Sequence, residues 1–314
     1  MPPVIRVRVP ATVANFGPAF DALAVAVTLY NDVYLDRDAT GRVAIEGEGR
    51  DQLPHNGTNL VYRAAAEVAG RIDRDARFFV RCVNRIPVGR GLGSSAAAIV
   101  GGAVAANELF GRPLSPADLL DIAWRMEGHP DNVAAALFGG GVLTCATNGR
   151  VAWTRIDPSW TAALVVAVPE FAVSTVAARA ALPERVPLRD AAANLGRTGW
   201  LVTAMLTGRT DLLSTAMEDS LHQPYRRTLV PGLDDVFASA KAAGAYSAAL
   251  SGSGPSIVAV APPDVAESVG EKMVEAFARS GSVSRYLVLD IDKHGAIVET
   301  TKAEGGGHVC LPNS

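Results

Sequence analysis

Apolar and polar residues alternate with a period of two along the first fifty positions of the chain. The segment VIRVRVP at 4–10 alternates Val or Ile with Arg, and DVYLDR at 32–37 and RVAIEGEG at 42–49 continue the pattern. Successive side chains of a strand point to opposite faces, so this period is typical of half-buried strands. The chain is therefore predicted to begin with a group of strands.

From residue 59 the spacing of the apolar residues changes repeatedly between the helix and the strand period. The predicted order is helix 59–71, strand 77–87, a glycine-rich loop, an alanine-rich helix, helix 114–128 and strand 138–147. Helix 114–128 has clear ends, because Ser115 is a favoured N-cap, Pro116 suits the first helical position and Gly128 suits the C-terminal end.

A second set of elements follows a cluster of turn residues at 148–160. It consists of strand 163–169, helices 190–208 and 231–244, a strand–loop–strand segment at 245–262, helix 264–281 and strand 284–292. Helices and strands mixed in this order predict an α+β protein with two domains. We place the first domain at 1–152, the second at 153–300, and a flexible, glycine-rich tail at 301–314.

The composition excludes several classes of protein. Of the 314 residues 49% are hydrophobic and 19% are charged, as in globular proteins, and the net charge of −3 comes without a basic block that would bind nucleic acid. No apolar run reaches the roughly 18 residues of a membrane span, and the first residues have no signal-like apolar core. The three cysteines form no C-x-x-C pair, which favours a reducing, cytoplasmic location and argues against a zinc site.

The stretch PVGRGLGSSAAAIVGGAVAAN at 87–107 places glycines and two serines directly before the alanine-rich helix. Glycines allow positive φ angles, and a helix N-terminus carries partial positive charge, so this loop is suited to hold an anion such as a phosphate. Ser94 or Ser95 would cap the helix or offer a hydroxyl to a phosphate or a metal. The loop is neither a Walker A motif nor a complete G-x-G-x-x-G motif, and a simple tight connection is the alternative.

The same stretch resembles the phosphate loop P-x3-G-x-G-S-S-A-A of the GHMP kinases, a family named after kinases of galactose, homoserine, mevalonate and phosphomevalonate. PATVANFGPAFDALAVAV at 10–27 resembles the N-terminal signature of the homoserine-phosphorylating members, with departures at Val13, Ala19 and Ala24. SGSGPS at 251–256 resembles the third family motif. EGHPDNVAAALFGGG and DSLHQPYRRTLVPG, at 127–141 and 219–232, resemble further segments of that subgroup.

The resemblance, which spans residues 4–295, implies an N-terminal domain of the ribosomal-S5-domain-2-like type and a ferredoxin-like C-terminal domain. It implies that ATP is bound by the loop residues Pro87, Val88, Gly89, Arg90, Gly91, Leu92, Gly93, Ser94, Ser95, Ala96 and Ala97. Glu127 and Ser95 are expected to act in catalysis and to bind Mg²⁺, since a metal must bridge the phosphate oxygens. A cation would also explain a carboxylate at a helix C-terminus, although an exposed Glu127 without a role is the alternative.

The expected substrate is L-homoserine, which would be phosphorylated on its side-chain hydroxyl in threonine biosynthesis. Its ammonium requires oxygen ligands, which Asn15, Asp21 and Asp131 offer, and its carboxylate suits a guanidinium. The resemblance gives the carboxylate to Arg179 and Arg226, with Arg185 and Arg227 as neighbouring alternatives, and adds Asn132 and Gly252 to the substrate site.

Three questions stay open at this stage. Asp131 is either a general base or only a substrate ligand, and His129 is expected to order the turn that presents it. A kinase for mevalonate or L-threonine, and a non-catalytic sensor on the same fold, remain alternatives. A homodimer is a further possibility.

Overall fold

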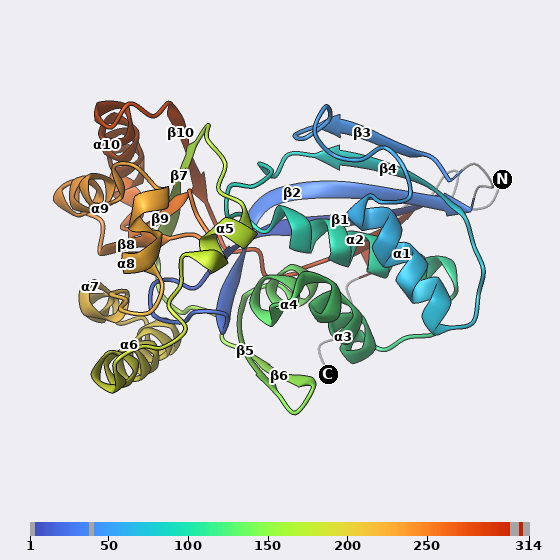
Figure 1. Cartoon of the computed structure of the whole chain (residues 1–314), viewed down its shortest axis with the longest axis horizontal. Helices are drawn as coiled ribbons and strands as arrows, with labels where there is room; N and C mark the ends of the chain where they lie inside the picture. The colour runs from blue at the N-terminus through green and yellow to red at the C-terminus, as the bar shows by residue number, and fades with distance from the viewer. Residues whose placement is uncertain (1–3, 38–40, 302–307, 310–314) are drawn as a thin grey trace.

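The protein is described here by a computed structural model of residues 4–37, 41–301 and 308–309, and it contains two β-sheets flanked by helices (Figure 1). The first sheet has eight strands in the order β12-β11-β1-β2-β4-β3, with β5 paired to β2 and β6 paired to β5. Its strands are β1 (Val4–Ala14), β2 (Leu23–Arg37), β3 (Val43–Gly47), β4 (Phe78–Asn84), β5 (Gly141–Thr147), β6 (Arg150–Arg155), β11 (Ile297–Thr301) and β12 (His308–Val309).

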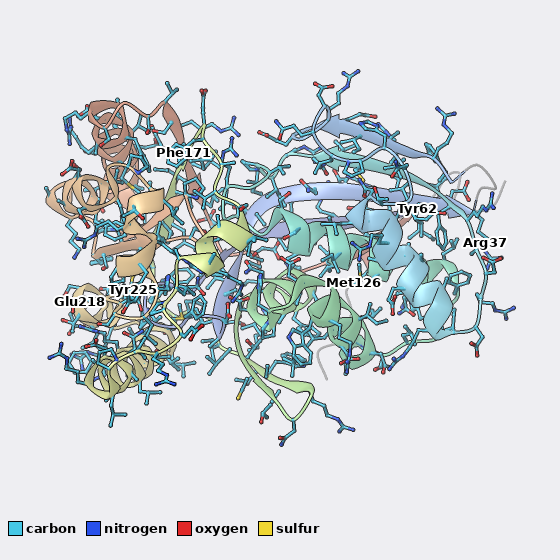
Figure 2. All side chains as sticks on the ribbon, in the orientation of Figure 1. Arg37, Tyr62, Met126, Phe171, Glu218 and Tyr225 are labelled. Carbon is cyan, nitrogen blue, oxygen red and sulfur yellow. The ribbon has the colours of Figure 1, made fainter. Side chains whose placement is uncertain are left out.

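Four helices cover one face of this sheet: α1 (Leu60–Arg71), α2 (Ser94–Leu109), α3 (Pro116–Glu127) and α4 (Pro130–Phe138) (Figure 1). Helix α2 is closely packed on two sides, which explains why its residues are small. A Cβ atom on Gly101 would lie 2.7 Å from Val33 Cγ2 of the sheet, and one on Gly102 would lie 2.2 Å from the Val61 carbonyl oxygen of α1. Larger side chains fill the layer around α2. Tyr62 of α1, labelled in Figure 2, packs edge-on against Phe78 of β4 with the ring centroids 5.8 Å apart.

The second sheet is antiparallel throughout, with the order β10-β7-β9-β8. It consists of β7 (Ala163–Pro169), β8 (Ser247–Leu250), β9 (Ile257–Ala261) and β10 (Ser284–Leu289), and the helices α9 (Leu233–Ala242) and α10 (Ala266–Arg279) pack on it. Four more helices join this half: α5 (Thr175–Ala180), α6 (Leu188–Thr207), α7 (Leu213–Ala216) and α8 (Gln223–Arg226). The predicted α+β class with two domains is confirmed.

The predicted division at 152/153 differs from the strand pairing in two places. It falls inside β6, which extends to Arg155 and pairs with β5 in the first sheet. In addition, β11 returns to the first sheet, where Ile297 lies opposite Arg8. Of the tail predicted as flexible, Thr301 ends β11 and His308–Val309 form β12, while 302–307 and 310–314 lie outside the described residues.

No helix within the described residues is both long enough and apolar enough to cross a membrane.

Candidate active site

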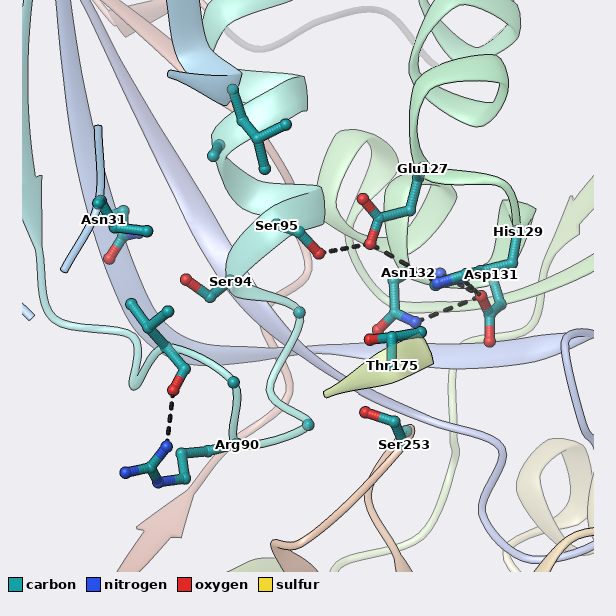
Figure 3. A pocket seen from close by; sticks show the side chains of 18 of the residues that line it. Asn31, Arg90, Ser94, Ser95, Glu127, His129, Asp131, Asn132, Thr175 and Ser253 are labelled. Carbon is teal, nitrogen blue, oxygen red and sulfur yellow. Dashed lines mark hydrogen bonds and ion pairs between the residues drawn. The ribbon is translucent and has the colours of Figure 1, made fainter. Parts of the chain in front are cut away.

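One cavity of about 370 Å³ lies where segments of both sheets meet (Figure 3). The connection between β1 and β2, the loop before α2, the junction of α3 and α4, helices α5 and α8, and the loop between β8 and β9 all contribute to it. The predicted residues outside the loop that line it are Asn15, Asp21, Glu127, Asp131, Asn132, Arg179, Arg226 and Gly252. Neither alternative arginine, Arg185 or Arg227, lines this cavity.

The loop at 87–93 has its carbonyl groups occupied and its N–H groups available. The carbonyl oxygens of residues 88–92 all accept hydrogen bonds, from Arg90, Val173, Ser256, Ser251 and Thr12 respectively. Within the described part of the chain, no hydrogen bond is donated by a backbone N–H of residues 89–96. A row of available N–H groups that ends at a helix N-terminus is the arrangement that binds phosphates.

The start of α2 corrects one prediction about the serines. Gly93, with φ at 68°, is the N-cap residue, and no side chain caps the helix. Ser94 and Ser95 are instead the first two residues inside the helix, and both line the cavity. The expectation that one of them caps α2 is therefore wrong, and both hydroxyls face the site.

Two glycines of the loop are required by close packing. A Cβ atom on Gly91 would lie 2.2 Å from the Ser251 carbonyl oxygen, and one on Gly93 would lie 2.0 Å from Thr12 Oγ1. Both residues also have positive φ angles, which side chains rarely adopt. The loop is thus fixed against β1 on one side and against the β8–β9 loop on the other.

The remaining loop residues differ in what they offer. Leu92, Ala96 and Ala97 are fully buried, so their side chains serve packing. The Arg90 guanidinium donates hydrogen bonds to the carbonyl oxygens of Val88, Pro169 and Glu170, the first two at 2.9 Å (Figure 3). Its side chain therefore connects the loop to the end of β7.

Glu127 and Ser95 meet inside the cavity. Ser95 Oγ donates a hydrogen bond to Glu127 Oε1 over 2.5 Å, and the Glu127 side chain is only 9% exposed, which overturns the alternative of an exposed carboxylate (Figure 3). Burial raises the pKa of Glu127, although the Ser95 hydrogen bond and the nearby His129 oppose this effect. Two adjacent oxygen ligands, one of them a carboxylate, fit a hard divalent cation such as Mg²⁺.

His129 connects Glu127 to Asp131. Its Nδ1 atom lies 2.8 Å from Asp131 Oδ1, and its Nε2 atom lies 3.6 Å from Glu127 Oε1. Burial would lower the pKa of His129, but the hydrogen bond and charge of Asp131 and the charge of Glu127 raise it overall. The same Asp131 oxygen accepts a hydrogen bond from the Asn132 N–H at 2.8 Å, so the carboxylate is held in one orientation.

The predicted substrate ligands of opposite charge are paired with each other. Arg179 donates two hydrogen bonds to the Asp21 carboxylate, at 3.0 and 2.8 Å. Arg226 is buried and donates to the carbonyl oxygens of Ala178 and Gly252, at 3.2 and 3.1 Å. Burial and the neighbouring Arg179 lower the pKa of Arg226 to about 10.

Phe20 and His222 lie beside these charges. The guanidinium carbons of Arg179 and Arg226 lie 5.6 and 5.2 Å from the centre of the Phe20 ring, which also stacks on the buried His222. The chain reaches this point through an unusual turn, because Asn15, Phe16 and Asp21 all have positive φ angles. Such conformations are uncommon for residues other than glycine and cluster at functional sites.

Several lining residues were not predicted as ligands. Phe20 was part of the signature without a role, His129 was given a structural role, and Thr175 and Ser253 were not singled out. The apolar end of the cavity includes the predicted loop residue Val88, but its other residues, Leu53, Pro54, Leu60 and Val61 with Asn59 and Asn84, were missed. These residues come from elements whose sequence carries no motif, so only their positions in the fold bring them to the site.

Comparisons with known proteins agree with this arrangement. The family "GHMP kinases N terminal domain" matches residues 59–140, and "GHMP kinases C terminal" matches residues 201–279. The chain is 43% identical to the homoserine kinase of Moorella thermoacetica, over 93% of this chain and 99% of that protein. It is 41% identical to the homoserine kinase of Desulfitobacterium hafniense, over 94% and 100%. The crystal structure of homoserine kinase from Cytophaga hutchinsonii superposes with a TM-score of 0.86 at 32% identity, covering 94% of this chain and 97% of that one.

Proposed function

Because the chain belongs to the GHMP kinase family, we propose that it is a homoserine kinase. It transfers the γ-phosphoryl group of ATP to the side-chain hydroxyl of L-homoserine and releases ADP and O-phospho-L-homoserine, a step toward threonine. The observation that carries the proposal is the presence of Asp21, Arg179 and Arg226 in one cavity with the glycine-rich loop. A zwitterionic substrate requires charges of both signs beside a phosphate site.

ATP occupies the cavity along its length in this proposal. The N–H groups of residues 89–96 bind its phosphates, and the apolar end formed by Leu53, Pro54, Leu60, Val61 and Val88 receives its base, with the amides of Asn59 and Asn84 as hydrogen-bond partners. The charged residues at the opposite end bind the amino acid. This division agrees with the clustering of the charged groups, because Arg179 is near enough to Asp21, Asp131 and Glu127 for their charges to raise its pKa.

The Ser95 hydroxyl and the Glu127 carboxylate are the residues that would hold Mg²⁺. When bound, the ion neutralises charge on the phosphate oxygens during transfer. Asp21, His129 and Asp131 also bring ligand atoms within 4.8 Å of one another, but Asp21 is paired with Arg179 and Asp131 with His129. We therefore keep the metal site at Ser95 and Glu127.

The residues of this chain contribute to the transfer mainly by binding and orienting. Asp21 and Asn15 bind the ammonium, and Arg179 and Arg226 bind the carboxylate, which brings the hydroxyl toward the loop. We assign Asp131 a substrate-binding role, because its Oδ1 atom is already engaged by His129 and Asn132. The hydroxyl proton can then leave late, to a phosphate oxygen.

A coupled assay of ADP release tests the proposal with homoserine, L-threonine and mevalonate as separate substrates. We expect efficient turnover of homoserine and weak turnover of the other two. Preferred turnover of mevalonate would refute the assignment, because mevalonate has no ammonium for Asp21. ATP binding without ADP release from any substrate would favour a sensor. We place the protein in the cytoplasm, where free thiols such as Cys82 and Cys145 persist.

A further inference from the structure

A fully buried histidine, His222, lies beside the substrate end of the cavity and takes no direct part in the proposed transfer. It directly precedes α8, and its ring stacks on Phe20, which lines the cavity, with the ring centroids 5.2 Å apart. Its Nε2 atom lies 2.7 Å from the Gly17 carbonyl oxygen. A carbonyl oxygen only accepts hydrogen bonds, so Nε2 carries a proton and donates it. In the neutral ring, Nδ1 is then left as an acceptor.

The surroundings of His222 hold its ring in place. Asp219 is buried, and its Oδ2 atom accepts hydrogen bonds from the backbone N–H groups of His222 and Gln223, at 2.9 and 2.7 Å. The acceptor of the ring is fixed as well, because Gly17 has a φ of 89° and a Cβ atom on it would lie 2.1 Å from the Met217 carbonyl oxygen. The ring is therefore held between a fixed backbone and a fixed carbonyl group.

The Nδ1 atom of His222 faces Arg226. Arg226 Nη1 lies 3.2 Å from Nδ1, and since a guanidinium only donates hydrogen bonds, Nδ1 accepts this one. Burial and the charge of Arg226 lower the pKa of His222, and together they outweigh the opposing effect of Asp219. The ring is thus neutral near neutral pH, and both of its hydrogen bonds require the same tautomer.

The hydrogen bonds of Arg226 leave one part of its guanidinium available. Nε donates to the Ala178 carbonyl oxygen at 3.2 Å, and Nη1 donates to the Gly252 carbonyl oxygen at 3.1 Å as well as to His222. Within the part of the chain that the structure describes, Nη2 donates to no group, yet it is not closed off from solvent. Because Arg226 is only 2% exposed and lines the cavity, the two N–H groups of Nη2 open into the cavity.

The other predicted carboxylate ligand is already occupied. Both terminal nitrogens of Arg179 donate to the carboxylate of Asp21. Arg226 Nη2 can therefore bind a substrate carboxylate without first breaking an ion pair. Its direction depends on the groups that hold Nε and Nη1, and among the described residues His222 is the one that does so with its side chain.

We propose that His222 is a positioning residue, whose Nδ1 atom holds Arg226 so that Nη2 points at the carboxylate of the substrate. The inference rests on the proposed function, which supplies that carboxylate. Without an acceptor at this position, one N–H group of Nη1 would be buried without a partner, which is costly, and the guanidinium would turn to pair it. The carboxylate would then meet a guanidinium that must first be reoriented, so binding would weaken while the transfer step stayed the same.

Two substitutions at position 222 separate positioning from packing. His222→Asn places an amide oxygen where Nδ1 lies and keeps the acceptor for Arg226, but it loses the hydrogen bond to Gly17. His222→Gln places an amide nitrogen where Nε2 lies and keeps the hydrogen bond to Gly17, but it offers Nη1 no acceptor. If His222 served only to pack and to anchor Gly17, His222→Gln would be the milder change.

We expect the reverse order in initial rates of ADP release. His222→Gln should raise the homoserine KM about tenfold, the usual effect of losing a hydrogen bond to a charged group, with kcat and the KM for ATP nearly constant. His222→Asn should recover most of the lost affinity. Circular dichroism and thermal melting should show that both variants are folded.

A double-mutant cycle shows whether His222 acts through Arg226. Arg226→Met removes the guanidinium, so adding His222→Gln to it should change the homoserine KM little further. Nitrogen NMR of the five histidine rings needs no substrate, and His222→Asn identifies the signals of His222. The wild-type His222 ring should be neutral and protonated at Nε2, and its Nδ1 signal should shift in Arg226→Met.

The proposal fails if His222→Gln binds homoserine as tightly as the wild type, or if His222→Asn is impaired more than His222→Gln. Additive effects of His222→Gln and Arg226→Met, or a His222 ring protonated at Nδ1, would also overturn it. Preferred turnover of mevalonate would instead refute the proposed function, and the same comparison would then be made with mevalonate, which also carries a carboxylate. If neither compound is turned over, calorimetric affinities take the place of KM, and binding of neither would overturn both proposals.

Discussion

Replacing Asp21 by Asn should selectively remove the preference for a substrate that carries an ammonium group. The informative comparison is between homoserine and 4-hydroxybutanoate, which has the same hydroxyl and carboxylate but lacks the amino group. Asp21→Asn removes the charge that binds the ammonium, and it also frees Arg179 from the two hydrogen bonds that it makes in the present structure. The variant should therefore bind homoserine more weakly and 4-hydroxybutanoate no worse.

The size of the effect follows from the exposure of the pair. A hydrogen bond to a charged group contributes roughly 1.5 to 3 kcal/mol. The Asp21 side chain is 33% exposed and that of Arg179 is 38% exposed, so water screens part of the interaction and the lower end applies. About 1.5 kcal/mol corresponds to about a tenfold change in affinity. The KM for homoserine, divided by the KM for 4-hydroxybutanoate, should therefore rise about tenfold in Asp21→Asn.

Initial rates of ADP release at saturating ATP measure both KM values, and the KM for ATP should stay nearly constant. Glu46→Gln is a matched control, because Glu46 also pairs through both carboxylate oxygens with an arginine, Arg81, but lies outside the cavity. If the ratio of the homoserine KM to the 4-hydroxybutanoate KM is the same in Asp21→Asn as in the wild type, Asp21 does not bind the ammonium.

Three further predictions concern Ser94 of the loop, Glu127 and His129. Ser94→Asp places a carboxylate at the N-terminus of α2, where it stabilises the helix but repels a phosphate. Calorimetry should show that this variant loses its affinity for ATP, whereas Ser94→Asn, the neutral control, retains it. Glu127→Gln keeps the shape of a proposed metal ligand and removes its charge, so kcat should fall by orders of magnitude with little change in homoserine KM; near-normal turnover at saturating Mg²⁺ would contradict the metal role. The pKa of His129 is raised above its ordinary value of 6.5, so its ion pair stabilises the fold fully below pH 6.5 and less as the pH rises through the folded-state pKa. The difference in the free energy of unfolding between the wild type and His129→Gln, measured in urea, should therefore shrink with rising pH. A difference that stays constant would argue against the ion pair.

The comparison of sequence and structure shows where local patterns are sufficient. Helix 114–128 was predicted almost to the residue, because Ser115 and Asp118 form a capping box and Gly128 ends the helix in a left-handed conformation. In contrast, α4 was not predicted, since its first residues Pro130–Asn132 read as a turn. Pro130 at the first helical position and Asp131 in the first turn are nevertheless ordinary signals of a helix start, so local sequence does carry evidence for this helix.

In the candidate site, too, the motifs predicted the residues but not how these residues pair. The motifs identified Ser95, Glu127, Asp21 and Arg179, all of which line the cavity. They did not predict that Asp21 and Arg179 would pair with each other, because these residues are 158 positions apart and no local spacing relates them. The sequence also does not show that a side chain at Gly93 would clash with Thr12, so that a substitution there would disturb the fold as well as the phosphate site.

The pairing of β1 with β11 has a consequence for how the chain matures on the ribosome. The edge of β1 that β11 covers, from Val4 to Arg8, is synthesised long before its partner at Ile297–Thr301. All the residues that line the cavity, the last of them Ser253, have been translated by then. A nascent chain halted before residue 297 would thus contain all the residues that line the cavity, but the edge of β1 would be uncovered. Uncovered strand edges pair readily with other chains. Synthesis of β11 therefore determines when this edge of β1 is covered and protected from pairing with other chains, and this happens after all the cavity-lining residues have been made.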